Sequence, residues 1–176
     1  MYKSKNIDFG FIILNPESNP SLLKNTVNSI SNKFEKAQYI CATEKTVKTD
    51  SFKEMKAICP TFKGEGTYTS LMNVGMKHAP AEWNFFIMAG TYVRPKLDQK
   101  FSFFMENEKD ILFPIVENKY NFVDATLNGL LVHKTCFKEV GNMAEIGPFE
   151  VCKLMWALDA MDKGYKFKAI LGVKLC

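Results

Sequence analysis

The sequence predicts a single α/β domain over residues 1–176, in which a mixed, mostly parallel sheet is flanked by helices. Short apolar runs typical of buried strands alternate with segments whose apolar residues recur at helical spacing. No repeat, low-complexity tract or Gly/Ser linker divides the sequence, and 176 residues suffice for one well-filled domain. With 47% hydrophobic and 24% charged residues, the composition is that of a globular rather than a disordered chain.

The first half of the chain begins with a buried strand over 9–14, a short apolar run that ends before Asn-Pro. Asn19 and Pro20 then predict the start of a helix, with Asn as the N-cap and Pro at the first helical position. Leu23, Val27, Ile30 and Phe34 recur at helical spacing and give this helix one core face. The remaining elements of this half are a strand over 38–42, a short helix over 51–56, a short strand over 57–59, a loop over 61–67 and a helix over 69–77.

The second half opens with a strongly apolar strand over 84–88, which composition places in the middle of the sheet. A turn over 89–91 follows it. Pro148 opens the last helix and Gly164 closes it at the C-cap position, and an apolar stripe runs along this helix through Val151, Leu154, Met155, Leu158 and Met161. The other predicted elements of this half are a helix over 97–106 and strands over 111–116, 127–132 and 165–171.

Composition excludes several classes of protein. No segment approaches the roughly 18–20 unbroken apolar residues of a membrane span, and the run over 9–14 is too short for a secretory signal, so the cytoplasm is the expected compartment. The net charge of +4 comes from scattered lysines and one arginine, Arg94, which does not favour nucleic-acid binding. Five cysteines without a C-x-x-C pair support neither zinc nor a disulfide framework, and Cys41 and Cys152 are expected to be buried thiols. The sequence is compatible with a homo-oligomer.

Short passages occur in an order typical of one enzyme family. They are the run Asn73-Val74-Gly75 followed by 83–87, the segment 92–95, the segment 129–141 and the closing Gly164-Tyr165-Lys166. This order resembles the GT-A fold of nucleotide-sugar glycosyltransferases, particularly family 2. The resemblance implies a GT-A-like (Rossmann-like) domain that transfers a sugar, of the hexosyl type, from a nucleoside-diphosphate sugar to a glycan or protein acceptor. The loop Lys63–Gly66 and the turn 89–91 are also similar to small glycosyltransferase-like proteins of tailed phages, which implies the host cytoplasm.

The chain departs from the family pattern at two places, the first of which concerns the metal. The family carries Asp-X-Asp after the central strand and uses it to hold a divalent cation, Mn²⁺ or Mg²⁺, against the diphosphate; this chain has Met88-Ala89-Gly90 there. It also has Met72 where the family has an arginine before Asn73. Three accounts stay open: other residues hold a metal, lysine and backbone donors replace it, or the protein binds without catalysing. Candidate metal ligands are Asp124, His133 and Glu150.

The resemblance also implies where a nucleotide-sugar donor binds. Polar residues after the first two strands would hold the base and ribose, Lys63 before a helix N-terminus would meet the diphosphate, and the turn after the central strand would let a phosphate or ribose approach. The candidate contacts are Asn15, Glu17, Thr43, Glu44, Lys63, Asn73, Gly90 and Thr91. Each of these residues is equally compatible with an ordinary loop, turn or helix position.

An inverting transfer needs a general base, which in the family lies at the start of the last helix. Glu150 fits that place, and Glu145 is its neighbour. The alternative is that Glu150 only decorates a helix N-terminus. His133 ends a strand that is expected to face the same region.

Two other functions compete with the glycosyltransferase hypothesis. The first is a catalytically silent GT-A-like binding module, which the missing Asp-X-Asp supports. The second is a nucleotidyltransferase, and the lack of a Walker or G-x-G-x-x-G loop weakens this hypothesis.

Overall fold

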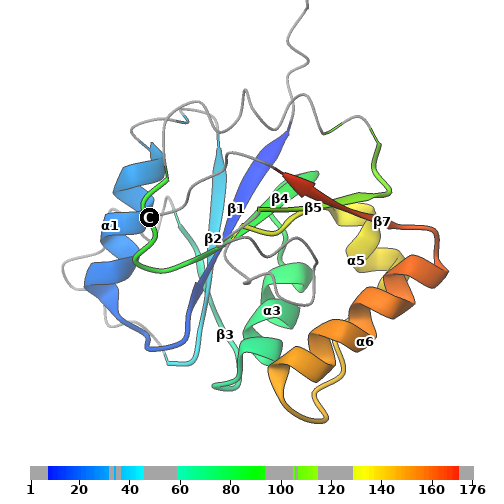
Figure 1. Cartoon of the computed structure of the whole chain (residues 1–176). Coiled ribbons are helices and arrows are strands. Elements are labelled where there is room, and N and C mark those ends of the chain that lie inside the picture. Colours follow the sequence, from blue (N-terminus) through cyan, green and yellow to red (C-terminus); the bar gives the residue numbers. More distant parts are fainter. Residues whose placement is uncertain are drawn as a thin grey trace, which may run out of the picture.

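The computed structural model describes residues 8–31, 34, 37–45, 59–93, 105, 107–114 and 129–170. Within them, one sheet runs in the order β3-β2-β1-β4-β6-β5-β7 (Figure 1). The strands are β1 (Phe9–Asn15), β2 (Gln38–Thr43), β3 (Thr61–Lys63), β4 (Trp83–Met88), β5 (Asp110–Pro114), β6 (Leu131–His133) and β7 (Lys166–Ile170). The helices are α1 (Pro20–Ser31), α3 (Tyr68–Lys77), α5 (Lys134–Val140) and α6 (Phe149–Asp162).

The pairing of the strands confirms the predicted mixed, mostly parallel sheet. β1 lies parallel to β2 and β4, β2 parallel to β3, and β5 parallel to β7, whereas β6 runs antiparallel to β4 and β5. The first four strands therefore end at one edge of the sheet, here called the carboxyl edge, at Asn15, Thr43, Lys63 and Met88. The opposite edge, where β1, β4 and β5 begin, is called the amino edge. It includes His133, because antiparallel β6 ends beside Trp83, the first residue of β4.

Helices cover both faces of the sheet (Figure 1). α1 packs on one face, where Leu23, Val27 and Ile30 join Phe11 and Ile13 in a buried cluster. On the other face, α3, α5 and α6 contribute to a second buried cluster, which includes Ile12, Leu71 and Trp156. Gly75 lets α3 approach this face closely, because a Cβ there would lie 2.5 Å from Cγ2 of Ile12. The apolar residues of β1 alternate between the two clusters, as expected for a central strand covered on both sides.

Local signals at two helix ends are confirmed. The side-chain oxygen of Asn19 accepts hydrogen bonds from the backbone N–H groups of Ser21 and Leu22, so Asn19 caps α1 and Pro20 is its first residue. Gly164 follows α6 with φ of 82°, a conformation that glycine adopts without strain. None of the helices that the structure describes is long and apolar enough to cross a membrane.

Two expectations about elements are wrong, and one helix was missed. Thr61–Lys63 is not loop but an edge strand, because it pairs with the end of β2. Helix α5 was not predicted. The apolar stripe of the last helix faces outward: its members, Val151, Leu154, Met155, Leu158 and Met161, are 38–56% exposed. α6 instead buries Cys152, Trp156 and Ala160, because Trp156 supplies the largest fully buried side chain and donates its indole N–H to the Gly141 carbonyl. The helices predicted over 51–56 and 97–106 and the strand over 57–59 fall largely or wholly outside the described residues.

Candidate functional site

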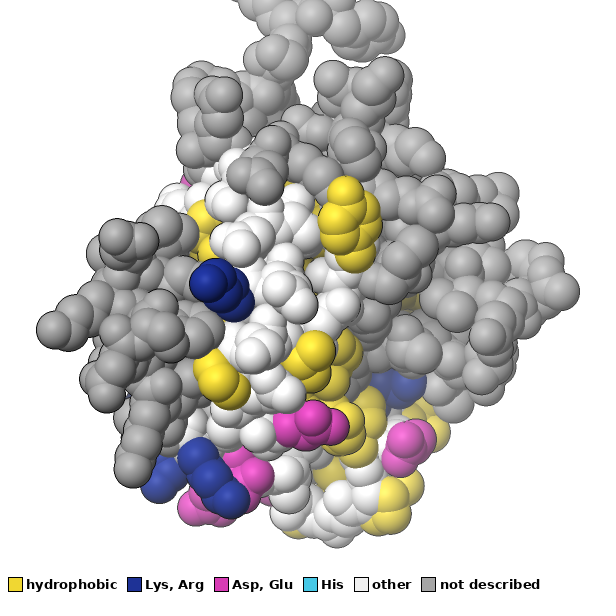
Figure 2. Space-filling view, turned by 90° about the vertical axis from the view of Figure 1, so that its left-hand side faces the viewer, with side chains coloured by type: hydrophobic (Ala, Val, Ile, Leu, Met, Phe, Trp, Pro, Cys, Tyr) yellow, Lys and Arg dark blue, Asp and Glu magenta, His cyan; other side chains and the backbone are white. Residues whose placement is uncertain are grey.

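The carboxyl edge brings together the strand-end residues that the sequence singles out. Asn15 pairs with Thr43, Thr43 pairs with Lys63, and Leu14 pairs with Met88, so the ends of β1 to β4 lie side by side. The N-terminal ends of α1, α3 and α6 reach the same end of the molecule, at the bottom of Figure 1. On the face over α1, acidic and basic side chains gather toward this end (Figure 2). In open α/β sheets this is the edge at which ligands bind.

The end of β1 and the end of β2 are joined through Ser18. Its hydroxyl accepts hydrogen bonds from the Thr43 hydroxyl, at 2.9 Å, and from the Lys45 backbone N–H, at 2.8 Å. Ser18 has a φ of 53°, a left-handed conformation that costs a non-glycine residue energy. Asn15 is buried and exchanges two hydrogen bonds with the backbone of Asn19. The loops after β1 and β2 are therefore held in place by Asn15, Ser18 and Thr43.

The loop after β3 packs against the loop after β2. A Cβ on Gly66 would lie 3.0 Å from Cδ of Glu44, so Gly66 allows this close approach. Thr67 caps α3 by accepting a hydrogen bond from the Ser70 N–H, and the Ser70 hydroxyl accepts one from the Glu65 N–H. Lys63 is exposed beside this loop. The prediction that Lys63 lies before a helix N-terminus is therefore correct, although the residue itself belongs to a strand.

The turn after β4 is tied to α1. Gly90 has a φ of 97°, and its N–H donates to the Thr26 hydroxyl at 2.8 Å. Gly90 is exposed, whereas Thr91 is buried and has internal contacts. A Cβ on Gly90 would contact the Leu22 side chain at 3.4 Å, so the open side of this turn depends on glycine for its conformation rather than for its space. Gly90 thus offers exposed backbone at the carboxyl edge, and Thr91 does not.

Asn73 lies in the middle of α3 and joins that helix to the segment before α6. Its amide nitrogen donates to the Met143 carbonyl, at 2.9 Å, and to the Glu145 carboxylate, at 2.8 Å, while its amide oxygen accepts from the Met143 N–H, at 2.8 Å. The side chain is 7% exposed. Its polar atoms are therefore already bonded within the protein, and Glu145 is held by the same contact.

Glu150 is exposed in the first turn of α6. A ring contact between Phe149 and Tyr68, with centroids 6.0 Å apart, places the start of α6 beside the start of α3. Within the described residues, Glu150 has no hydrogen bond or ion pair, unlike Glu145. Glu150 is therefore the carboxylate at this end of α6 that is free to meet a ligand.

His133 does not lie where the sequence suggested. It ends β6 at the amino edge, where its Nδ1 caps α5 by accepting a hydrogen bond from the Thr135 backbone N–H, at 3.4 Å. Burial lowers the pKa of His133, although the carboxylates of Glu108 and Glu82 oppose that shift. The expectation that His133 faces the same region as Glu150 is wrong, because the antiparallel direction of β6 carries it to the opposite edge. Asp124 lies outside the described residues.

The residues at the carboxyl edge do not fit the divalent cation that the family resemblance implies. The segment after β4 offers the side chains of Met88 and Ala89, the backbone of Gly90 and a buried Thr91, none of which is a carboxylate. Among the described residues, no three His, Cys, Asp or Glu side chains are grouped so that they could hold a metal ion. Hard cations prefer carboxylate and carbonyl oxygens. Charge on a bound diphosphate would therefore have to be met by this chain's own side chains.

The two cysteines that the sequence singles out are buried, as expected: Cys41 in β2 and Cys152 in α6. Burial raises the pKa of Cys41, and it raises that of Cys59 to about 12. Because the neutral thiol is a poor nucleophile, Cys41 and Cys59 are core residues rather than candidates for a covalent mechanism.

The structure thus divides the predicted donor contacts into two groups. The exposed or half-exposed group can meet a ligand directly and consists of Glu17, Glu44, Lys63 and Gly90. The buried group is bonded within the protein and consists of Asn15, Thr43, Asn73 and Thr91. Sequence reasoning missed Ser18, Thr26 and Ser70, whose hydroxyls hold the three loops. The Ser18 position in an Asn-Pro-Glu-Ser turn was the available signal, since short polar side chains bond nearby backbone in turns.

No protein-family model matches the chain, and no curated protein matches it. Solved structures of S. aureus TarS do. TarS 1–349 superposes with a TM-score of 0.70 at 12% identity, over 96% of this chain and 59% of TarS 1–349. Its complexes with UDP-GlcNAc and with UDP give TM-scores of 0.67 and 0.63 at 13% and 14% identity, over 57% and 59% of their chains. This chain spans about three fifths of TarS 1–349. At these identities the likeness establishes the fold, which is a GT-A-like, Rossmann-type domain.

Proposed function

We propose that this protein is a glycosyltransferase that binds a nucleoside-diphosphate sugar at the carboxyl edge and transfers the sugar to a glycan or protein acceptor. The observation that carries the proposal is the convergence of Asn15, Thr43, Lys63 and Met88 at one edge of a GT-A-like sheet. Two structures of the same fold, those of TarS, hold UDP-GlcNAc and UDP. Uridine diphosphate is therefore the first nucleotide to test.

The donor would be held in two ways. Asn15, Ser18 and Thr43 fix the loops after β1 and β2, and the half-exposed Glu44 and exposed Glu17 on those loops accept hydrogen bonds from ribose or base. The diphosphate meets the Lys63 ammonium and lies beside the exposed turn at Gly90, whose own N–H already donates to the Thr26 hydroxyl. An ammonium beside a phosphate stabilises the charge that builds up on the departing diphosphate as the sugar leaves. The Lys63 ammonium thus takes the role that a metal ion plays in the family that the sequence resembles.

The transfer step would use Glu150 as general base. The acceptor hydroxyl oxygen forms a bond to the anomeric carbon of the sugar, and the bond from that carbon to the diphosphate oxygen breaks. The carboxylate of Glu150 takes the hydroxyl proton, and the nucleoside diphosphate leaves with the bonding electron pair. Glu150 is exposed and makes no hydrogen bond or ion pair with the described residues, which suits it to this role, since a base must reach the proton it removes.

A silent binding module is the second candidate function. The segment Met88–Gly90 favours it, because no carboxylate stands where the family holds its metal. In that case the carboxyl edge binds the nucleotide sugar or a related ligand without turnover. Both functions predict binding, and only the first predicts release of the nucleoside diphosphate.

Isothermal titration calorimetry with UDP, GDP, CDP and UDP-GlcNAc, each with and without Mn²⁺, tests the nucleotide binding that both functions predict. We expect one nucleotide to bind, and binding without Mn²⁺ would support the role of Lys63. Nucleotide release from the bound donor, with and without candidate acceptors, then separates the two functions.

The variant Glu150→Gln should bind the nucleotide as the wild type does and lose turnover by about 10²–10⁴-fold. Asp159→Asn, an exposed carboxylate on the same helix, is its control. Turnover retained in Glu150→Gln would contradict the assigned base, and no binding of any nucleotide would contradict the proposed function itself.

A further inference from the structure

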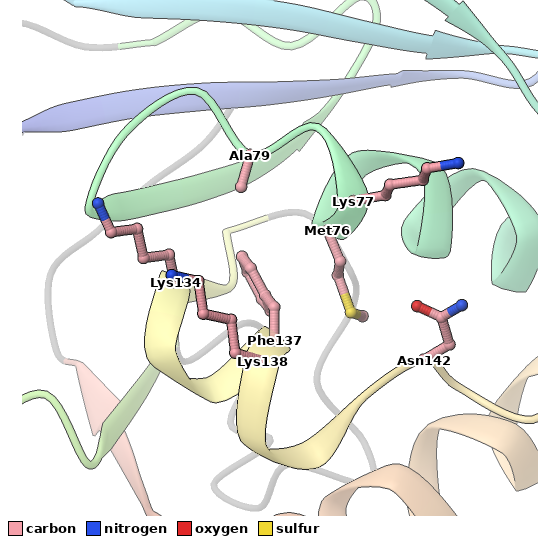
Figure 3. Close-up of a pocket in the computed structure, with 7 residues that line it drawn as sticks. All are labelled: Met76, Lys77, Ala79, Lys134, Phe137, Lys138 and Asn142. Carbon is pink, nitrogen blue, oxygen red and sulfur yellow. The ribbon is translucent and has the colours of Figure 1, made fainter.

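A cavity of about 490 Å³ lies between the C-terminal end of α3 and helix α5 (Figure 3). Its volume falls in the range of small-molecule pockets, about 300–1,000 Å³. Its lining combines apolar and cationic side chains and consists of Met76, Lys77, Ala79, Lys134, Phe137, Lys138 and Asn142. Nothing in the proposed transfer reaction uses these residues.

The cavity is separate from the carboxyl edge. Thr67 caps α3 at that edge, whereas Lys77 is in the last turn of the helix, about 15 Å further along at 1.5 Å per residue. Lys134 begins α5 directly after His133, which lies at the amino edge. A ligand in this cavity is therefore not the diphosphate of a donor bound at the strand ends, and its binding does not depend on the proposed transfer reaction.

The cavity carries an excess of positive charge. Three lysines line it, and the described residues offer one carboxylate partner: Glu82, 3.4 Å from the Lys134 ammonium. Within the described part of the chain, Lys77 and Lys138 have no hydrogen bond or ion pair. Figure 3 shows Lys134 and Lys138 on one side of Phe137 and Lys77 on the other. Two of the three lysines of this cavity therefore have no carboxylate partner among the described residues.

The floor of the cavity is apolar. The side chains of Phe137, Met76 and Ala79 form this floor, and Phe137 and Met76 also belong to the buried cluster beneath α3 and α5. Asn142 adds an exposed amide, which can donate and accept hydrogen bonds. An inorganic anion would leave the apolar floor uncovered, and an uncharged apolar ligand would leave the ammonium groups without a partner.

We propose that this cavity binds an organic phosphate monoester, with the phosphate among the lysines and the organic group on Phe137 and Met76. A phosphate monoester carries close to two negative charges at neutral pH and three strong acceptor oxygens, so it can engage several ammonium groups at once. A carboxylate carries one charge and would be satisfied by fewer. Because the lysines are partly or largely exposed, their attraction is screened by salt, and binding is expected to weaken as ionic strength rises.

Phenyl phosphate is the probe, titrated into the ¹⁵N-labelled full chain and followed by the shifts of backbone amides. We expect concentration-dependent shifts at Ala79, Phe137, Lys138 and Asn142, with inorganic phosphate binding more weakly and phenol not binding there. The double variant Lys77→Gln/Lys138→Gln should weaken phenyl phosphate by about threefold to tenfold, since each exposed charge contributes modestly.

The matched control removes the same charge elsewhere. Lys24→Gln/Lys166→Gln replaces two exposed lysines, one on α1 and one on β7, and should leave the affinity unchanged. The same spectra show whether each variant is folded. Equal weakening by both double variants, absence of shifts around the cavity, or equal affinity for inorganic phosphate and phenyl phosphate would each overturn the proposal. UDP added to the same sample reports the carboxyl edge separately, so failure here and failure of the proposed function are distinguishable.

Discussion

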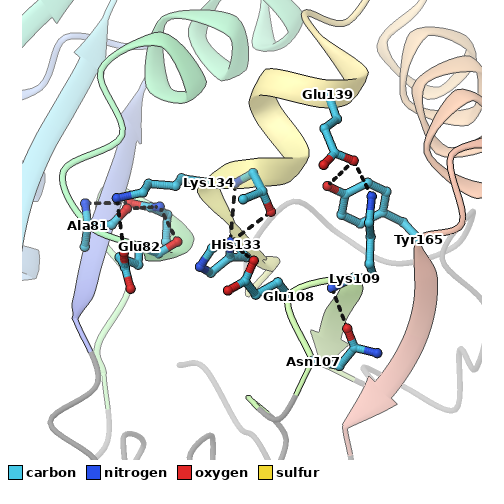
Figure 4. Close-up of polar contacts among 11 residues, drawn as sticks. Ala81, Glu82, Asn107, Glu108, Lys109, His133, Lys134, Glu139 and Tyr165 are labelled. Atoms are coloured by element: carbon cyan, nitrogen blue, oxygen red, sulfur yellow. Dashed lines mark hydrogen bonds and ion pairs between the residues drawn. The ribbon is translucent and has the colours of Figure 1, made fainter.

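The two edges of the sheet use polar side chains in different ways. At the amino edge, charged groups bind each other: Lys109 and the Tyr165 hydroxyl both contact the Glu139 carboxylate, and the Lys109 ammonium lies 4.2 Å from the centre of the Tyr165 ring (Figure 4). At the carboxyl edge, uncharged side chains bind the backbone of neighbouring loops, as Ser18 and Asn15 do. Lys63, Glu17 and Glu150 there have no ion pair within the described residues.

The difference favours the carboxyl edge as the place where the proposed nucleotide would bind. A charge already paired with its neighbour gains little from a ligand, whereas an unpaired charge on a fixed loop can meet one without first losing a partner. Hydrogen bonds from Asn15, Ser18 and Thr43 hold the carboxyl-edge loops in place before a ligand arrives. Such preorganisation lowers the cost of ordering on binding.

The largest effect should follow from the substitution Asn73→Ala. It removes three hydrogen bonds and leaves the Met143 backbone groups without partners in a buried place. The expected loss is about 2–3 kcal/mol in the free energy of unfolding, measured by urea denaturation. Asn25→Ala, at an exposed position of α1, is the control and should change the stability by less than about 0.5 kcal/mol. Equal losses of stability in the two variants would show that the hydrogen bonds of Asn73 to Met143 and Glu145 do not stabilise the fold.

The next effect separates strain from bonding at Ser18. Ser18→Ala loses the hydroxyl but keeps the left-handed conformation, whereas Ser18→Gly loses the hydroxyl and relieves the strain. We expect the glycine variant to be about 1 kcal/mol more stable than the alanine variant in thermal unfolding. Both variants should bind the nucleotide more weakly than the wild type, because the loops after β1 and β2 are no longer joined. Unchanged nucleotide affinity in both would show that Ser18 does not position the site.

A smaller, pH-dependent effect should come from His133. Burial holds its folded pKa below the ordinary 6.5, so below pH 6.5 the unfolded chain binds a proton that the folded chain resists. The contribution of neutral His133 to the free energy of unfolding is therefore fully present above pH 6.5. It is lost as the pH falls toward the folded pKa, at no more than about 1.4 kcal/mol per pH unit. His133→Asn, which keeps a capping side chain, should flatten the stability curve between pH 6.5 and 5. An equally steep curve in this variant would assign the loss to other groups.

The smallest effect should come from Glu139. A hydrogen bond from Lys109 holds the Glu139 pKa below its ordinary 4.5. Its contribution to stability is present above pH 4.5 and is lost as the pH falls through the folded pKa. Because the pair is exposed, Glu139→Gln should change the stability little at neutral pH, and the change should shrink further in high salt. A large, salt-independent loss would show that the amino edge is more than a set of surface ion pairs.

Local signals were sufficient for much of the fold. Neighbouring residues alone predicted the start of α1 at Asn19-Pro20, the end of α6 at Gly164 and the apolar strands. The structure confirms these elements. β3 was missed because three residues become a strand only by pairing with β2. α5 was missed because a histidine caps it and only seven residues follow.

The site depended on information that no local pattern carries. The direction of β6 moves His133 to the amino edge, and nothing in its own residues encodes that direction. The contact between Asn73 and Met143 joins residues 70 positions apart. Helix α6 buries the face that carries Trp156, so its stripe of apolar residues points outward. The spacing of apolar residues along the helix does not show which of the two faces is buried. Which strand-end residues are exposed and which are buried could likewise be known only from the packed structure.

Binding of UDP at the carboxyl edge is best tested by titrating UDP into the ¹⁵N-labelled protein and following the shifts of the backbone amides. We expect shifts around Glu17, Glu44, Lys63 and Gly90, with little change around Glu139 at the amino edge. Shifts centred on the amino edge, or none at saturating UDP and at saturating GDP and CDP, would contradict the assignment of the carboxyl edge as a nucleotide site.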